Sequence, residues 1–208
     1  MAASAGVATP IKPWKNPLGS GTALPIIRRM AEKAAQVIAN GPLGTPCQVD
    51  VAGATGFIIE NPAITSVATA VIAGFTVEPF NNLTTSGLAK ILNTGFAVQN
   101  QSAAVVIPIG APPNDGTIGF YMAGDEMTFV GTLGNSNTAA NATIAQADLT
   151  KIYGLTQDAT NKFWYIDNFI TTAATGACVE IVELIDPVGT LNGREGFKVT
   201  GVAQQLQQ

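Results

Sequence analysis

The sequence has no histidine and few charged residues. It therefore lacks the commonest general base, the commonest metal ligand and the usual activator of a serine or cysteine nucleophile. Asp, Glu, Lys and Arg make up 12% of the chain, about half of the usual share of roughly 25%. So little charge gives neighbouring molecules little electrostatic reason to stay apart. We therefore expect much of the surface to lie against other protein, with a monomeric β protein of low charge as the alternative.

Cysteine is also scarce. Cys47 and Cys178 are the only two, they form no Cys-x-x-Cys pair, and no histidine is present to complete a zinc site. Each has apolar or small neighbours, which predicts two buried free thiols, with a disulfide between them as the alternative. We expect no metal and no cofactor.

Long apolar runs are missing as well. The opening "MAASAGVATPIKPWK" lacks the apolar core of a secretory signal. The longest apolar stretch, 63–77, is interrupted by Thr and Ser and is shorter than the roughly 20 residues that cross a bilayer. We expect a soluble protein with no membrane partner, made in a bacterial-type cytosol, and the 208 residues, 47% of them apolar, allow a sizeable core.

The charge is distributed unevenly. The first forty residues carry five basic side chains and one acid, a net charge of +4, and the remainder carries five basic side chains and thirteen acids, a net charge of −8. The basic residues are too few and too widely spaced to follow a phosphate backbone, so we expect no nucleic acid. A basic arm on an acidic body favours docking onto an acidic protein surface. The predicted contact residues are Lys12, Trp14, Lys15, Arg28, Arg29 and Lys33.

We predict that residues 1–40 form an extended N-terminal arm. Its first part is rich in Pro, Gly and Ala, and Trp14 is its one large anchor. That indole suits either a pocket of a partner or a site on the chain's own body. Over 24–39 the apolar spacing predicts a short helix that starts near Pro25, although its later part also fits an edge strand.

The body, 41–208, reads as β structure. Short runs rich in Val, Ile, Thr and Phe alternate with Gly, Pro and Asn breakers, and no long helix separates them. This pattern predicts a mainly β fold, an antiparallel barrel or sandwich with at most one or two short helices. "ADLTKIYG" reads as one helical turn with Asp148 as its N-cap and Gly154 at its exit. Residues 179–200 read as the closing hairpin, with its turn shaped by Asn192-Gly193.

Four acids gather in that hairpin: Glu180, Glu183, Asp186 and Glu195. Side chains alternate along a strand, so Glu180 and Glu183 are expected on opposite faces and form no catalytic pair. Arg194 and Glu195 are expected to form a weak local ion pair. The sequence also lacks a calcium loop, a phosphate-binding glycine loop and a Gly-x-Ser-x-Gly motif. We therefore expect no enzyme.

The aromatic run 163–165 allows a second hypothesis, a carbohydrate-binding β module of a surface protein. Trp164 and Tyr165 would stack on the sugar, with Asp167 and Asn161 nearby. The simpler interpretation assigns these rings to the core and to an interface.

Two stretches carry a family resemblance: "ATIAQADLTKIYGLTQDATNKFWYIDNF" and "ACVEIVELIDPVGTLNGREGFKVT". Together they resemble the small head decoration, or cement, proteins of tailed bacteriophages, with a good match over about 140–200 and a weaker one over 45–130. The matching residues are Asp148, Leu149, Lys151, Tyr153, Gly154, Leu155, Trp164, Tyr165, Asp167, Asp186, Val188, Gly189, Asn192, Gly193, Arg194 and Phe197.

The resemblance implies a structural virion protein without catalytic residues. Such a protein would lie on the capsid exterior, assemble with copies of itself as a dimer or trimer, and bridge major capsid protein subunits. Residues 24–39 match no part of the pattern, so the resemblance does not identify the segment that makes the contact.

Overall fold

The computed structural model describes residues 9–15, 27–31, 43–50, 58–60, 71–77, 117–124, 127–138, 141–158 and 163–206. Within these ranges the chain forms eleven strands and two short 3-10 turns, η1 (Gln146–Asp148) and η2 (Ala173–Thr175). This confirms the predicted mainly β fold with few and short helical segments. No helix among these residues has the length and apolar character needed to span a membrane.

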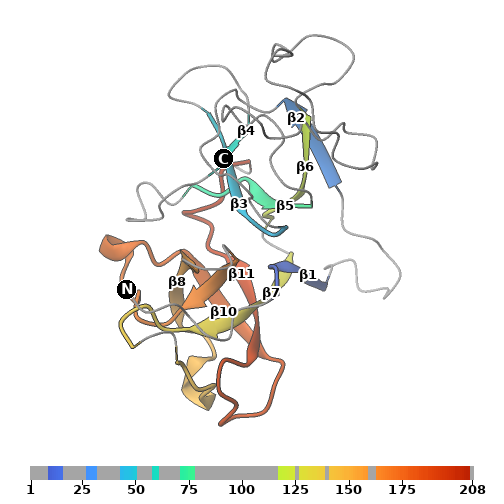
Figure 1. Cartoon of the computed structure of the whole chain (residues 1–208). Helices are drawn as coiled ribbons and strands as arrows, with labels where there is room; N and C mark the ends of the chain where they lie inside the picture. The colour runs from blue at the N-terminus through green and yellow to red at the C-terminus, as the bar shows by residue number, and fades with distance from the viewer. Residues whose placement is uncertain are drawn as a thin grey trace, which may run out of the picture.

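The C-terminal part of the chain forms a closed five-stranded barrel (Figure 1). Its strands are β7 (Thr128–Gly134), β8 (Ile152–Gln157), β9 (Trp164–Asp167), β10 (Val179–Leu184) and β11 (Arg194–Val199). They follow one another around the ring as β7-β11-β10-β8-β9, and β9 returns to β7. The β7–β9 pairing is parallel and the others are antiparallel. The expected closing hairpin is present as β10 and β11.

The first strand, β1 (Lys12–Lys15), continues this sheet. β9 reaches only Leu133 and Gly134 of β7, whereas β1 pairs antiparallel with Thr128–Val130. β11 pairs with residues 129–132 of β7. Because β1 and β11 share register partners on β7, they lie on opposite edges of it. β1 therefore covers the part of the β7 edge that β9 leaves open.

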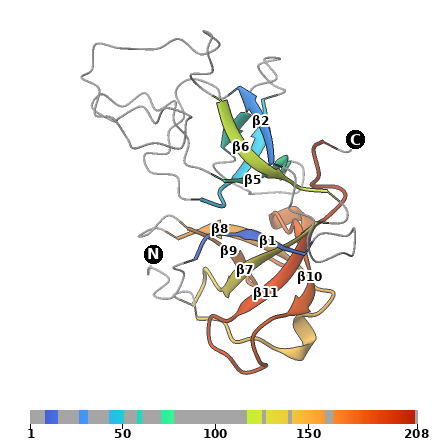
Figure 2. The ribbon, with the colours of Figure 1, turned by 90° about the vertical axis from the view of Figure 1, so that its right-hand side faces the viewer.

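A second sheet lies against the barrel and has the order β2-β6-β5-β3-β4 (Figure 2). Its strands are β2 (Ile27–Ala31), β3 (Pro46–Val49), β4 (Ile58–Glu60), β5 (Gly74–Thr76) and β6 (Thr117–Met122), all paired antiparallel. The prediction of a helix over 24–39 is wrong for residues 27–31. These residues form an extended strand that pairs along its whole length with β6.

Three aromatic rings join the sheet to the barrel. Phe75 on β5 packs against Phe129 on β7 and Phe197 on β11, with ring centroids 4.6 and 5.8 Å away. All three rings are fully buried and belong to one continuous core. A smaller core on the sheet contains Cys47, Ile58, Ala73, Ile118 and Phe120. The sheet thus shares one hydrophobic core with the barrel and has another of its own.

The segment after β11 forms a further link between the two parts. Ile72 pairs with Gln204 in a parallel bridge, and the Gln205 side chain accepts from the Val49 N–H and donates to the Val49 carbonyl. The segment that follows β11 is thereby connected to β3, through Val49, and to Ile72, which lies just before β5.

The two cysteines are buried free thiols, as predicted. Cys47 lies on β3 of the sheet and Cys178 directly precedes β10 of the barrel. Burial raises the pKa of both thiols, that of Cys178 to about 12. Each thiol is therefore protonated. The second sheet and the barrel thus each contain one buried thiol whose reactivity can report local opening.

The expected helical turn at 147–154 is shorter and earlier than predicted. η1 ends at Asp148, and Ile152 already begins β8. Asp148 sits at the third position of the turn rather than at its N-cap, and its carboxylate accepts a hydrogen bond from the Ala145 N–H at 2.7 Å. Gly154 lies within β8 instead of at a helix exit. Two of the runs rich in Val, Ile and Phe that the sequence pattern reads as strands, "GFAVQNQ" and "AAVVIPIG", fall outside the described residues.

Candidate partner-binding surface

β1 is anchored at its start by an apolar side chain. Ile11 is 2% exposed and belongs to the main core, and the Thr9 hydroxyl lies 3.1 Å from that of Thr132 on β7. Gly44 faces Ile11 with a φ of +78°, and a Cβ there would collide with the Ile11 backbone. Only glycine combines this conformation with such a close approach. The segment that contains β1 is thus packed on the body of the molecule.

Glu183 fastens the other end of β1, through contacts that we call the β1 latch. Its carboxylate accepts from the Trp14 indole N–H at 3.0 Å and from the Lys15 ammonium at 2.7 and 2.8 Å. Neighbouring residues of a regular strand point to opposite faces. The register of β1 shifts between Pro13 and Lys15, and this irregularity lets both side chains reach one carboxylate. The Lys15 hydrogen bond, followed by that of Trp14, lowers the pKa of Glu183.

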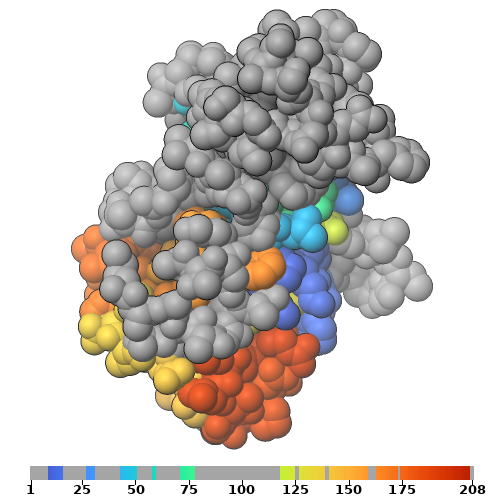
Figure 3. All heavy atoms as spheres, in the orientation of Figure 1, coloured from blue at the N-terminus to red at the C-terminus, as the bar shows by residue number. Residues whose placement is uncertain are grey.

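The latch leaves part of β1 at the surface. Trp14 is 41% exposed, and Lys12 and Lys15 are exposed as well. In the space-filling view β1 borders the red surface of the closing hairpin (Figure 3). Of the two roles expected for Trp14, the structure shows the indole resting on its own body, with a large part of the ring still accessible.

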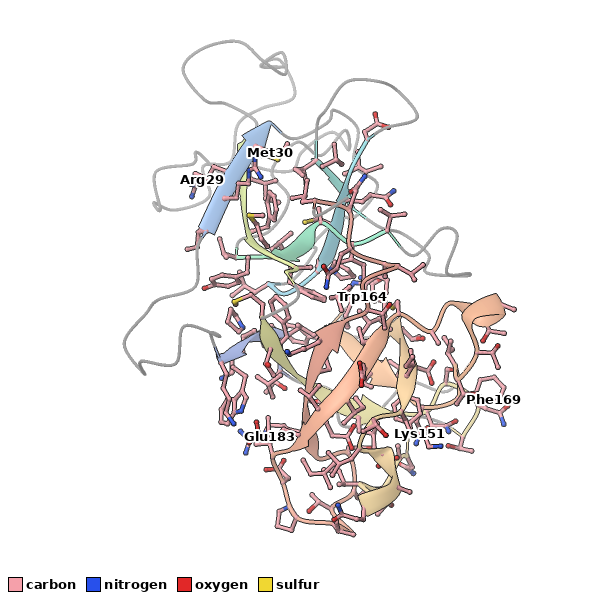
Figure 4. All side chains as sticks on the ribbon, turned by 180° about the vertical axis from the view of Figure 1, so that it is seen from behind. Arg29, Met30, Lys151, Trp164, Phe169 and Glu183 are labelled. Carbon is pink, nitrogen blue, oxygen red and sulfur yellow. The ribbon has the colours of Figure 1, made fainter. Side chains whose placement is uncertain are left out.

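The six predicted contact residues do not form one patch. Arg28 and Arg29 lie on β2, at the edge of the second sheet, and both are exposed. Figure 4 shows Arg29 on that sheet and Glu183, the partner of Trp14 and Lys15, on the barrel. The described basic residues are therefore divided between two sheets. Lys33 lies outside the described residues.

Sequence reasoning missed a second exposed apolar site, at the tip of the closing hairpin. Val188 and Leu191 are 55% and 57% exposed. Asn192, with a φ of +49°, holds the tip to the preceding loop, since its side chain accepts from the Ala142 N–H and its own N–H donates to the Ala142 carbonyl. Gly189 donates to the Ile144 carbonyl in the same way. The signal was present in the sequence: two apolar residues within a turn of otherwise polar and small ones.

The acids of the hairpin have separate roles. Asp186 accepts two hydrogen bonds from the Arg194 guanidinium, at 2.7 and 3.1 Å, and one from its backbone N–H. These bonds, the side-chain ones first, lower the pKa of Asp186. The expected Arg194–Glu195 pair is wrong, because Arg194 points outward to Asp186 and Glu195 points inward, where it is fully buried.

The predicted sugar-binding residues lie inside the molecule. Trp164 and Tyr165 are 3% and 4% exposed, and Asp167 is fully buried. Asp167 accepts from the Ser136 and Phe169 N–H groups and from the Thr156 hydroxyl, so it joins β9 to two loops and to β8. These rings cannot stack on a sugar at the surface, which overturns the predicted site and confirms their assignment to the core. Asn161 lies outside the described residues.

The polar residues that carry the family resemblance act as supports of the barrel. Asp148 holds η1 and Tyr153, Asp167 joins the end of β9 to β8 and to two loops, and Asn192 and Arg194 fix the hairpin tip. None of these five side chains is directed into an open cleft by its contacts. Within the described part of the chain, no group of three or more Cys, Asp or Glu residues gathers as metal ligands.

A comparison of the chain with known protein families, curated proteins and solved structures finds no match.

Proposed function

We propose that this chain is a head decoration protein of a tailed bacteriophage. It binds the outside of the capsid, bridges major capsid protein subunits, assembles with copies of itself, and acts through binding energy without catalysis. The observation that carries the proposal is that the residues of the resemblance form one continuous structural unit. The two stretches that carry the resemblance contain η1 and four of the five barrel strands, and the matching polar residues hold these elements together.

The surface supports the same function. A binding protein needs exposed side chains on a rigid support, because ordering a mobile segment costs free energy on association. Trp14, on the latched β1, and the pinned pair Val188 and Leu191 meet this requirement. Aromatic anchors in such positions often supply most of the binding energy of an interface. Each copy would bury these groups across a joint between capsid subunits, and many copies would add their contributions.

The first test is co-purification with intact virions of the phage that encodes the chain. We expect the protein at a fixed ratio to the major capsid protein, and we expect purified protein to sediment with capsids from which it has been stripped. Absence from virions, together with no sedimentation with stripped capsids, would overturn the proposal.

Two matched variants then locate the contact. Trp14 lies beside Glu183, and Figure 4 shows Phe169 on the opposite side of the barrel from Glu183. Both are exposed aromatic residues, at 41% and 56%. We expect Trp14→Ala to weaken capsid binding by about tenfold or more, as for a typical interface anchor, and Phe169→Ala to leave it unchanged. The reverse result would place the contact on the Phe169 side and would exclude β1 as the anchor.

A further inference from the structure

Glu195 is an ionisable side chain in the interior of the barrel. It lies on β11, two residues before Phe197, and the alternation of a strand directs both side chains inward. Its residue is fully buried, and no donor reaches either of its carboxyl oxygens. An ionised carboxylate without a donor in such a place is costly, so the group requires a proton or a counter-charge.

The polar group that meets Glu195 is another acid. Asp148 of η1 interacts with it and is itself 6% exposed. Asp148 already accepts from the Tyr153 hydroxyl and from the Ala145 N–H, each at 2.7 Å. Two ionised carboxylates have no donor to share, so a hydrogen bond between Glu195 and Asp148 requires a proton on one of them. Asp148 has two donors and Glu195 has none, which places the proton on Glu195.

No cation compensates the pair among the described residues. β7, which pairs with β11, has no titratable side chain, and β8 contributes Tyr153. On β10, Glu183 is engaged in the β1 latch, and Glu180 stands opposite Lys198 of β11. Arg194 is bonded to Asp186, and Lys151, after η1, is exposed.

We propose that a protonated Glu195 donates to Asp148 between β11 and η1, and that loss of this proton releases η1 from β11. The three groups come from three elements: Asp148 from η1, Tyr153 from β8 and Glu195 from β11. A second negative charge would repel Asp148 and would have no donor of its own. η1 is a turn of three residues, whereas β8 and β11 are each paired with two neighbouring strands in the ring. At alkaline pH, η1 would therefore detach from β11.

The direction of the pH effect follows from the burial. Burial first, and then the neighbouring Asp148, raises the pKa of Glu195 to about 8, from an ordinary value of about 4.3. Between these two values the unfolded chain has lost the proton while the folded chain keeps it. The contribution of the protonated pair to stability is therefore complete below about pH 4.3, declines as the pH rises, and is gone once the pH has passed the folded pKa.

The direct test is a carboxyl titration of the folded protein by NMR. The chain has seven glutamates, so ¹³C-labelled glutamate gives seven side-chain carboxyl signals. We expect the Glu195 signal, assigned by its loss in Glu195→Gln, to stay protonated through pH 6 and to titrate near pH 8. If Glu195→Gln does not fold, the wild-type spectrum still decides, because one of the seven signals must titrate far above the others. A spectrum in which every glutamate titrates below pH 5.5 would overturn the proposal.

The release itself can be followed by trypsin. Lys151 lies three residues after the end of η1 and is exposed, but its N–H donates to the Asp148 carbonyl and its carbonyl accepts from the Ile181 N–H. Between pH 7 and pH 9.5 we expect cleavage after Lys151 to accelerate by about threefold or more relative to cleavage after Arg28, because proteolysis follows the open population. The ratio cancels the pH dependence of trypsin.

Two variants complete the design. Glu195→Gln keeps the size of the side chain, can donate to Asp148 and should show no such acceleration. Glu183→Gln changes a surface glutamate of the same hairpin and should behave as the wild type does over this pH range. Equal acceleration in the wild type and Glu195→Gln would show that η1 opens for another reason and would overturn the release mechanism.

Discussion

The barrel and the second sheet both bury phenylalanine, but the barrel is closed whereas the sheet has two edge strands. In the barrel, β9 returns to β7, so the ring has no terminal strand. In the sheet, β2 and β4 each have a neighbour on one side only among the described strands. The barrel uses nearly continuous sequence from Thr128 to Val199, whereas the sheet brings together segments from Ile27 to Met122. Contacts between distant segments cost more chain entropy to form.

This difference predicts an unequal dependence of the two parts on each other. The sheet contributes Ile72 and Phe75 to the main core, which consists otherwise mostly of barrel residues. Its own cluster contains five fully buried residues. A small core of this kind provides limited stability alone. We therefore expect the sheet to need the barrel more than the barrel needs the sheet.

The largest expected effect on stability comes from replacing two buried phenylalanines, and comparing them tests this dependence. Phe197 belongs to the shared core and Phe120 to the core of the sheet, and both are fully buried. Each replacement by Ala should cost about 3–5 kcal/mol in the free energy of unfolding. Phe197→Ala should open both parts, whereas Phe120→Ala should open the sheet alone.

The two buried thiols report this result. Reaction of Cys47 with a thiol reagent, measured in a Cys178→Ala background, follows opening of the sheet, and Cys178 in a Cys47→Ala background follows the barrel. Phe197→Ala should speed up both reactions, and Phe120→Ala only that of Cys47. A Phe120→Ala protein in which Cys178 also reacts faster would show that the two parts open together.

A smaller loss of stability is expected from a substitution at Gly44, which contacts the backbone of Ile11 just before β1. Gly44→Ala combines a left-handed φ of +78° with a collision against Ile11, which should cost about 1–3 kcal/mol. The loss should fall mainly on β1, so exchange of those β7 amides that donate to β1 should increase while that of β10 and β11 is retained. Gly201, where a Cβ meets no atom within 4 Å, supplies the control Gly201→Ala. Unchanged exchange at these β7 amides in Gly44→Ala would show that β1 tolerates the displacement.

The smallest effect belongs to the β1 latch. Lys15 and Glu183 are 59% and 34% exposed, so solvent screens their attraction and Glu183→Gln should cost less than about 1 kcal/mol. The pKa of Glu183 is lowered, so the contribution of the latch is present above the ordinary pKa and is lost as the pH falls through the folded value. Chemical unfolding at pH 7 and pH 3 should therefore show a difference between the two proteins only at pH 7. A larger difference at pH 3 would contradict the assigned role of Lys15.

Much of the barrel was predictable from sequence because its signals are local. Residues 179–200 alternate as strands should, and Asn192-Gly193 marks the turn. The helix expected over 24–39 failed because apolar spacing over a few residues fits two periods, and pairing of Ile27–Ala31 with β6 decides between them. The division into a barrel and a sheet, and the docking of β1, depend on contacts more than a hundred residues apart, which no local pattern contains.

The site was less predictable. Trp14 and Lys15 were expected to contact a partner and both are exposed, but their shared partner within the chain, Glu183, is 168 residues from Lys15. Glu195 was misassigned to a surface ion pair with its neighbour Arg194. The necessary signal was available, because Phe197 and Val199 are apolar and a period of two places Glu195 on their face. The prediction placed Glu195 at the surface because it is an acid, although the alternation of the strand placed it inside. The burial of Asp148 was not apparent from sequence either.

The place of β11 in the ring sets the order of events during synthesis. β11 lies between β7 and β10, although it is the last of the barrel strands along the chain. As a nascent chain leaves the ribosome, β7 and β10 therefore have a vacant position between them until Arg194–Val199 emerges. Chains at that stage present two unpaired strand edges, which are the usual starting point for association between incomplete molecules. During this interval, folding would depend on rapid completion of translation or on a chaperone that covers those edges.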